Sequence, residues 1–268
     1  MKIQLYWLLL AALLLLSGKA DAANNKKPFV IPELQEWRGS QGMFTPTATS
    51  RIVYTGKDPS VVRVANQFAD DYALMFGRRM MVVQGRAAAG DFVFSLSSDS
   101  RLGEEGYTMK ITDRVTVTAP KSKGLYWATR KLLQLTEQQG NQALPKGTAR
   151  DYPDYAIRGF MMDCGRKFIP MSMLRDYVKM MAYYKMNTFQ IHLNDNAFKQ
   201  YYNHDWNKTY SAFRLECETF PGLTARDGYY TKKEFIALQQ LADSLGVEII
   251  PEIDVPAHSL ALTQYKPE

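Results

Sequence analysis

Three short segments of the sequence carry polar side chains whose chemistry suits proton transfer and the binding of hydroxyl groups. Arg158 and Asp163 belong to the first segment, His192 and Asp195 to the second, and Glu252, Asp254 and His258 to the third. A guanidinium presents a planar fork that can hold two neighbouring hydroxyl groups, and a carboxylate beside an imidazole fixes its tautomer and its pKa. Sugars require such directional donors and acceptors. Together the three segments predict a polyol-binding site with a proton-transfer network.

Taken singly, these residues also have ordinary structural explanations. An arginine at a strand start, such as Arg158, is typical of a surface or ion-pair residue. Asp163 and Arg166 are typical of a structural ion pair, and His192 is compatible with a core histidine whose hydrogen bonds are satisfied. The aromatic residues nearby can stack on a sugar face or can simply pack; they are Phe198, Tyr201, Tyr202 and Trp206. Only the joint arrangement favours a functional site.

A regular alternation of strands and helices positions these side chains. Residues 157–163, 188–193 and 247–254 are predicted strands, and two amphipathic helices separate them. The second helix begins with a capping box formed by Thr231 and Glu234. This alternation predicts parallel βα units, in which functional groups gather at the carboxyl ends of the strands.

A different pattern precedes these units. Residues 28–150 mix short β-branched or alternating runs with two apolar helical stripes, within 61–72 and 125–135, and predict a small α+β domain. Asp113 falls between two such runs and predicts a hairpin. Residues 140–153 are rich in Gly, Pro and polar residues and predict a linker or a long loop.

Composition excludes several classes of function. The 268 residues are 46% hydrophobic with a net charge of +6, and the scattered Lys and Arg residues argue against a nucleic-acid partner. The sequence does not decide whether Cys164 and Cys217 form a disulfide, although the position of Cys164 beside a predicted strand favours a buried free thiol. His192, His204 and His258 have no Cys or His partner at ligand spacing, so we expect neither a metal nor a cofactor.

The N-terminal residues resemble a targeting segment. A basic start is followed by the apolar run 5–16 and by Ala20-Asp21-Ala22, which is typical of a secretory signal peptide over residues 1–22. We expect cleavage after Ala22, export to the periplasm, the cell surface or the medium, and no stable membrane span afterwards. An uncleaved anchor or a buried helix is the alternative.

The three polar segments resemble the first three barrel strands of glycoside hydrolase family 20, which contains β-N-acetylhexosaminidases. They read RGFMMDCGRKF from Arg158, NTFQIHLND from Asn187 and PEIDVPAHS from Pro251. Residues 28–150 are similar to the small α+β domain that precedes the barrel in this family. The resemblance implies an α/β fold in which residues 155–268 form an incomplete (βα)8 TIM barrel, its first three βα units.

The resemblance also implies roles for four residues. Arg158 matches the arginine that binds hydroxyls of the terminal N-acetylhexosamine, and His192 matches the histidine that supports the sugar pocket. Asp195 and His258 match two members of a hydrogen-bonded network that a catalytic glutamate completes. In this family the 2-acetamido oxygen of the substrate attacks the anomeric carbon, an exception to the two-carboxylate scheme.

Some family features have no match in these residues. The aspartate that orients the acetamido group and the glutamate that acts as general acid form an Asp-Glu pair after the fourth strand, and no such pair occurs here. We therefore assign no general acid and expect a fragment whose sheet has an exposed edge. Asn196-Ala197 replaces a common Asp-Gln, and Ala257 replaces a common glycine. The first change predicts an altered substrate preference, with residues 211–216 at the pocket rim.

The expected function is removal of terminal N-acetylglucosamine or N-acetylgalactosamine from glycans by the enzyme of which this chain is a part. A noncatalytic carbohydrate-binding remnant is the alternative, and the reading frame beyond Glu268 distinguishes the two. A third possibility is another βα-barrel hydrolase that shares only the architecture, since fold alone does not fix function.

Overall fold

The computed structural model describes residues 24–138, 140 and 142–267, so the predicted signal peptide lies outside the described residues. The chain divides into two compact units after Tyr152, and each is described by itself below. Within the described ranges, no helix has both the length and the apolar character that a membrane span requires.

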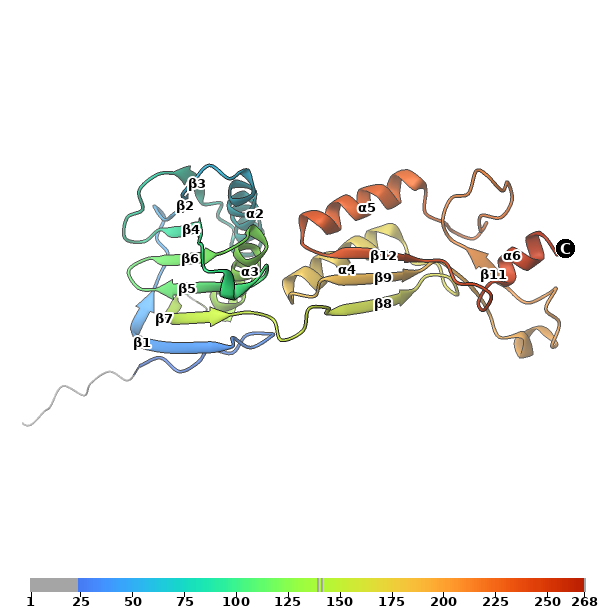
Figure 1. Ribbon diagram of the computed structural model, residues 1–268, viewed down its shortest axis with the longest axis horizontal. Coiled ribbons are helices and arrows are strands. Elements are labelled where there is room, and N and C mark those ends of the chain that lie inside the picture. Colours follow the sequence, from blue (N-terminus) through green and yellow to red (C-terminus); the bar gives the residue numbers. More distant parts are fainter. Residues whose placement is uncertain (1–23, 139, 141, 268) are drawn as a thin grey trace, which may run out of the picture. The chain divides into compact units, whose positions relative to one another are not determined.

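The first unit is built on a seven-stranded sheet with the order β1-β7-β5-β6-β4-β2-β3 (Figure 1). Its strands are β1 (Glu36–Phe44), β2 (Arg51–Tyr54), β3 (Met81–Gln84), β4 (Phe92–Leu96), β5 (Tyr107–Ile111), β6 (Val115–Ala119) and β7 (Leu144–Asp151), with a 3-10 turn η1 (Ser100–Leu102). β2, β3, β4 and β6 pair in parallel, whereas β1, β7, β5 and β6 pair antiparallel. The β5–β6 hairpin turns at Asp113, as the sequence predicts.

Two helices, α2 (Pro59–Phe76) and α3 (Ser122–Gln138), pack against each other and against this sheet. The side chain of Asp58 caps the first turn of α2, and Gly77 ends the helix in the left-handed conformation with a φ of 75°. The predicted stripe within residues 61–72 is buried, and so is the stripe within 125–135. The apolar face of each helix therefore supplies the core of this unit.

The prediction of a linker over residues 140–153 is wrong, because β7 occupies most of it. β7 pairs with β5 on one side and with β1 on the other. Its Gly147 faces the indole of Trp37, which would lie 2.5 Å from a Cβ atom at that position. Glycine here permits close side-chain approach within a strand rather than marking a loop.

The second unit contains three parallel strands with the order β12-β9-β8, joined through helices (Figure 1). The elements are β8 (Gly159–Asp163), α4 (Met171–Tyr183), β9 (Thr188–His192), α5 (Lys232–Ser244) and β12 (Glu248–Glu252). Thr231 and Glu234 form the predicted capping box at the start of α5. This part of the chain is the predicted set of three βα units of an incomplete barrel.

One face of this short sheet is covered by α4 and α5. Phe189 and Ile191 of β9 are fully buried on that face, together with Leu174 of α4 and Leu238 of α5. On the opposite face, which lines the interior in a closed barrel, Met161 of β8 remains 52% exposed. In the described part of the chain, β8 and β12 each pair on one side only.

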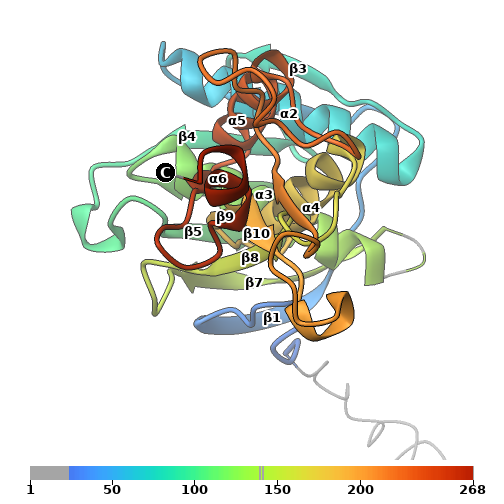
Figure 2. The same cartoon turned by 90° about the vertical axis from the view of Figure 1, so that its right-hand side faces the viewer.

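A long excursion separates β9 from α5. It contains the hairpin β10 (Asn194–Asn196) and β11 (Ser211–Phe213), with the 3-10 turn η2 (Lys199–Tyr202) between its strands. The last helix, α6 (Leu260–Tyr265), lies against both hairpin strands, and Figure 2 shows it beside β10. The hairpin thus begins directly at the carboxyl end of β9.

Candidate active site

The strand register brings polar residues from the three predicted segments into one row. Asp163 of β8 pairs with His192 of β9, and His192 pairs with Glu252 of β12. All three are the last residues of their strands. The carboxyl edge of the sheet is where βα folds place their functional groups, as expected.

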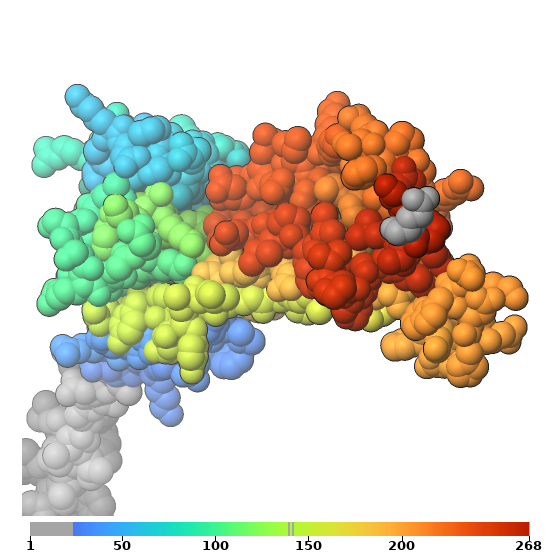
Figure 3. Space-filling model, turned by 45° about the vertical axis from the view of Figure 1, so that its right-hand side comes forward, coloured from blue at the N-terminus to red at the C-terminus, as the bar shows by residue number. Residues whose placement is uncertain are grey.

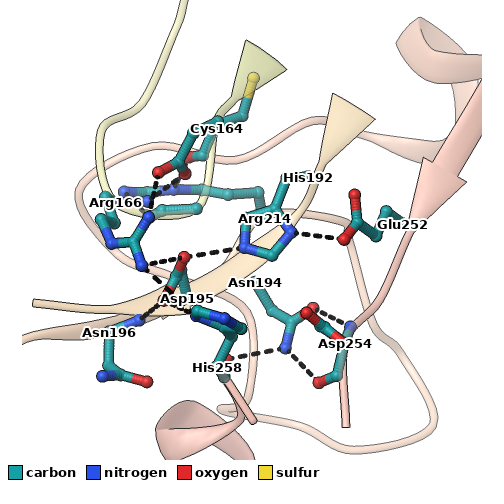
Figure 4. A network of polar contacts seen from close by, with 12 residues as sticks. Cys164, Arg166, His192, Asn194, Asp195, Asn196, Arg214, Glu252, Asp254 and His258 are labelled. Atoms are coloured by element: carbon teal, nitrogen blue, oxygen red, sulfur yellow. Dashed lines mark hydrogen bonds and ion pairs between the residues drawn. The ribbon is translucent and has the colours of Figure 1, made fainter. Parts of the chain in front are cut away.

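Asp195 is the centre of the cluster that follows this row (Figure 4). Its side chain is fully buried, and its Oδ2 atom lies 2.8 Å from Nε2 of His192 and 3.0 Å from Nη2 of Arg166. Its Oδ1 atom lies 2.9 Å from Nδ1 of His258 and accepts a 2.7 Å hydrogen bond from the backbone N–H of Asn196. One carboxylate therefore joins residues from all three βα units.

The neighbouring residue, Asn194, fixes the loop after β12 against this centre. Its side-chain amide donates to the carbonyl oxygens of Asp254 and His258, at 2.9 and 3.0 Å, and its Oδ1 accepts from the N–H of Asp254 at 2.7 Å. His258 has a φ of 55°, which few non-glycine residues adopt. Unusual backbone geometry of this kind concentrates at functional sites.

The surroundings shift the pKa values of two members in opposite directions. Burial alone would raise the pKa of Asp195, but the hydrogen bonds from Asn196, His258 and His192 and the charge of Arg166 hold it below 3.8. Burial alone would lower the pKa of His192. Hydrogen bonds and charges from Asp195 and Glu252 outweigh that effect and raise the pKa above 6.5.

Similar proteins have been found by sequence and by structure. Residues 155–268 match the protein-family model for the catalytic domain of glycosyl hydrolase family 20. Residues 27–152 match the protein-family model for domain 2 of the same family. The chain belongs to glycoside hydrolase family 20.

Individual relatives agree with this assignment. A β-hexosaminidase of Akkermansia muciniphila is 34% identical over 170 residues, which cover 62% of this chain and 34% of the relative. A β-N-acetylhexosaminidase of Cellulomonas fimi is 28% identical over 234 residues, covering 82% of this chain and 44% of the relative. The solved N-acetyl-β-hexosaminidase of Streptomyces plicatus aligns with a TM-score of 0.75 and 26% identity, over 91% of this chain and 49% of that one. The chain thus spans between a third and a half of these relatives.

Arg166, rather than Arg158, is the arginine that this family 20 chain brings to the cluster. Arg166 follows β8, and its Nη1 atom lies 2.8 Å from Oδ2 of Asp163 while Nη2 contacts Asp195. Asp163 and Arg166 thus form the ion pair that is expected from the sequence, and this pair holds the guanidinium at the carboxyl edge of the sheet. Its side chain is 37% exposed, so N–H groups remain available to an incoming ligand.

Arg158 lies at the other end of the same strand, and the role in sugar binding that the resemblance implies for it stays a prediction. Its Nε donates to the carbonyl of Lys185 at 2.7 Å, and its Nη1 donates to the carbonyl of Tyr155 at 2.6 Å. Five residues of extended strand separate the two ends by about 16 Å, beyond the reach of an arginine side chain. In this structure Arg158 fastens the amino end of β8.

His192 lies behind the exposed residues of the cluster, which is compatible with the supporting role that the resemblance implies. Its side chain is only 7% exposed, and both ring nitrogens face carboxylates, Nε2 at Asp195 and Nδ1 at Glu252. His258 is 40% exposed and lies beside Arg166 at the open side of the cluster. The exposed side of the cluster is therefore formed by Arg166 and His258, with Asp195 and His192 behind them.

Arg214 supports the site and was not identified from the sequence. Its side chain is fully buried, and it donates to the carbonyls of Cys164 and Gly165 at 2.8 and 3.1 Å and to Asp227 at 2.7 Å. These bonds hold the turn that leads from β8 to Arg166. Residue 214 belongs to the segment 211–216 that the sequence places at the pocket rim, and the available signal was an arginine directly after Ala212 and Phe213.

The cysteines and the possible metal ligands complete the description. Cys164 is buried and both cysteines are free, as expected for Cys164. Although no sequence spacing predicts a metal site, donor atoms of His192, Asp195 and His258 lie within 4.8 Å of one another, as do those of His192, Glu252 and Asp254. The guanidinium of Arg166 already neutralises Asp195, which disfavours a second cation in the first group.

Proposed function

We propose that the protein containing this chain is a β-N-acetylhexosaminidase that removes terminal β-linked N-acetylglucosamine or N-acetylgalactosamine from glycans with retention of configuration. The observation that carries the proposal is the cluster around Asp195, at the carboxyl edge of a family 20 sheet. The matched relatives named β-hexosaminidase support it.

The cluster supplies the part of the chemistry that binds and orients the sugar. The Arg166 guanidinium is fixed by Asp163 and Asp195 and is 37% exposed, and its remaining N–H groups can donate to a pair of vicinal sugar hydroxyls. His258 beside it can exchange a proton or a hydrogen bond with the reacting group, and Asp195 fixes its tautomer through Nδ1. In the proposed reaction the 2-acetamido oxygen of the substrate bonds to the anomeric carbon as the glycosidic C–O bond breaks, and the leaving oxygen takes a proton from a general acid that is not assigned among these residues. Water then attacks the anomeric carbon and restores the acetamido group, which gives the product with retained configuration.

The test of activity is the release of p-nitrophenol from the p-nitrophenyl β-glycoside of N-acetylglucosamine. We expect the product of the complete reading frame that contains this sequence to hydrolyse it. Substitution Arg166→Ala should lower kcat/KM by about tenfold to a hundredfold, since a hydrogen bond to a charged group contributes about 1.5–3 kcal/mol. Sugar binding without hydrolysis would favour the noncatalytic alternative instead.

Export is the second part of the proposal. The basic start, the apolar run and the small residues before Ala23 support a signal peptide, followed by a periplasmic, cell-surface or secreted protein. Mass spectrometry of the protein from its own host should find Ala23 as the first residue. A retained Met1 would overturn the proposed cleavage.

A further inference from the structure

The sheet of the first unit has a polar face on the side away from α2 and α3. Met109 of β5 and Ala149 of β7 face the helices and are fully buried. The side chains that alternate with them, Lys110 and Thr148, therefore lie on the opposite face, and both are exposed. In Figure 3 the surface of β1, in blue, lies along the lower side of the first unit, next to the yellow-green surface of the segment that contains β7.

Four cationic side chains lie on this polar face, one from each of four neighbouring strands. In the order of the strands across the sheet they are Arg38 of β1, Lys146 of β7, Lys110 of β5 and Arg114, the residue before β6. We call these four residues the cationic stripe. Neighbouring strands lie about 4.8 Å apart, so the stripe extends over about 14 Å across the sheet.

The cationic stripe has more positive charge than its surroundings neutralise. Arg114 lies 3.6 Å from the carboxylate of Asp113, whereas the other three cations form no ion pair within the described part of the chain. The nearest acidic residue of β1, Glu36, already pairs with Arg150 at 2.7 Å. Cations on neighbouring strands repel one another, and an anionic partner relieves that repulsion. The stripe is therefore complementary to an extended partner that carries several negative charges.

The groups between the cations suit a glycan better than a nucleic acid or a membrane. Thr148 lies between Arg38 and Lys110 in the register, and Thr116 of β6 pairs with Lys110 on its other side. Threonine hydroxyls both donate and accept hydrogen bonds, as sugar hydroxyls require, and the arginine fork matches sulfate or carboxylate groups. Because both intervening residues are threonines, these positions offer neither a ring for a nucleobase to stack on nor an apolar side chain to enter a bilayer.

We propose that the cationic stripe binds an anionic polysaccharide, whose sulfate or carboxylate groups contact Arg38, Lys110 and Lys146. The choice of a glycan rests on the proposed function, and the stripe adds to it a second, noncatalytic surface on the first unit. A polymer held there has a raised effective concentration near the protein that acts on its ends. Binding should weaken as salt is added, because exposed charges are screened beyond about 8 Å at physiological ionic strength.

The experiment measures the dissociation constant of heparin, a sulfated polysaccharide, for the protein that contains this chain. Arg38→Glu and Lys110→Glu should each raise the dissociation constant about fivefold or more, since a cation near an anionic surface contributes about 1 kcal/mol. Lys57→Glu is the matched control, because Lys57 is also exposed and its reversal changes the net charge equally, but it lies between β2 and α2. The control should stay within about twofold of the native value.

Further measurements protect the interpretation. Lys110→Gln removes one charge without adding another, and it should weaken heparin binding less than Lys110→Glu does. Thermal unfolding shows whether each variant folds. Heparin that fails to bind the native protein, or binds all variants and the control with one affinity, overturns the stripe as a binding site. Single-stranded DNA that binds as tightly as heparin and is lost in the same variants also overturns the proposal, because the stripe would then respond to charge alone.

Hydrolysis of the p-nitrophenyl glycoside, measured on the same samples, separates this inference from the proposed function. We expect Lys110→Glu to leave this hydrolysis unchanged. Hydrolysis without heparin binding overturns the stripe alone. Heparin binding that depends on Arg38 and Lys110, in a protein that does not hydrolyse the glycoside, supports the stripe and overturns the proposed function.

Discussion

Nε2 of His192 lies 2.8 Å from Oδ2 of Asp195. The other ring nitrogen, Nδ1, lies 3.2 Å from Oε1 of Glu252. A neutral imidazole has a single N–H and can donate to only one of these carboxylates, whereas an imidazolium donates to both. The arrangement therefore favours a protonated His192, which agrees with the raised pKa of this ring.

The first prediction concerns pH and the variant His192→Gln. Because the folded pKa of His192 is above the unfolded value of 6.5, its stabilisation is fully present below pH 6.5 and is lost as pH rises through the folded pKa. The native protein should therefore exceed the variant in free energy of unfolding most strongly at pH 5–6. Urea unfolding between pH 5 and pH 9 measures the difference.

Several titratable or charged groups face His192, and their ionisation could also affect the measured free energy of unfolding. The carboxyl groups are those of Asp195, Glu252 and Asp254, with Asp163 paired beside His192 in β8, and the nitrogen-bearing groups are the guanidinium of Arg166 and the imidazole of His258. The pKa of Asp195 is held below 3.8 by its hydrogen bonds, so changes at pH 6 and above do not report on its titration. A difference that grows as pH rises would contradict a protonated His192.

The second prediction concerns the charge of Asp195. Replacement by asparagine leaves the four groups that contact Asp195 facing a neutral side chain, and we expect a loss of about 2 kcal/mol in the free energy of unfolding at pH 7. The value is below that for a fully buried pair because Arg166 and His258 are more than a third exposed and can be hydrated. Urea unfolding is the measurement, and Asp243→Asn on the exposed side of α5 is the control.

The difference in free energy of unfolding between the native protein and Asp195→Asn should also change in a predictable direction at low pH. The pKa of Asp195 is below its ordinary 3.8, so its stabilisation is present above pH 3.8 and is lost as pH falls through the folded value. The difference between the native protein and Asp195→Asn should shrink at the lowest pH. An unchanged difference there would show that the carboxylate is not stabilised in its charged form.

The third prediction uses the close backbone approach at Gly165. A Cβ atom at this position would lie 2.7 Å from the backbone nitrogen of Asp195 and 2.8 Å from the carbonyl carbon of Asn194. Gly165→Ala should therefore displace the strand that carries Asp195 and destabilise the protein by about 2 kcal/mol. Gly140→Ala, whose Cβ meets nothing within 4 Å, should change thermal stability little. Equal melting temperatures for the two variants would refute the steric explanation.

Much of the fold could be predicted from the sequence, since the signals were local. The buried stripe of α2, the capping box at Thr231 and the hairpin at Asp113 each depend on residues within one or two turns of chain. β7 was missed because its stability comes from pairing with the distant β1, whereas its own Pro145 and Gly147 favour loops.

The site was predicted in part, for a related reason. Strand order and register, which bring Asp195 and His258 together, follow from the alternation of strands and helices. The place of Arg158 does not follow from this alternation, because Arg158 and Arg166 flank the same strand. Only the hydrogen bond from Arg158 to the backbone carbonyl of Lys185 shows that its side chain is held at the amino end of the strand. Arg214 escaped notice because its partners, the carbonyls of the turn after β8, are not visible in side-chain patterns.

The most direct measurement is the affinity of this chain for N-acetylglucosamine in the variants Arg166→Ala and Arg158→Ala, by NMR titration. If the sugar binds at the carboxyl edge beside Asp195, Arg166→Ala weakens binding by about tenfold or more and Arg158→Ala leaves the dissociation constant unchanged. If instead Arg158→Ala abolishes binding while Arg166→Ala retains it, the sugar does not bind at the site described here.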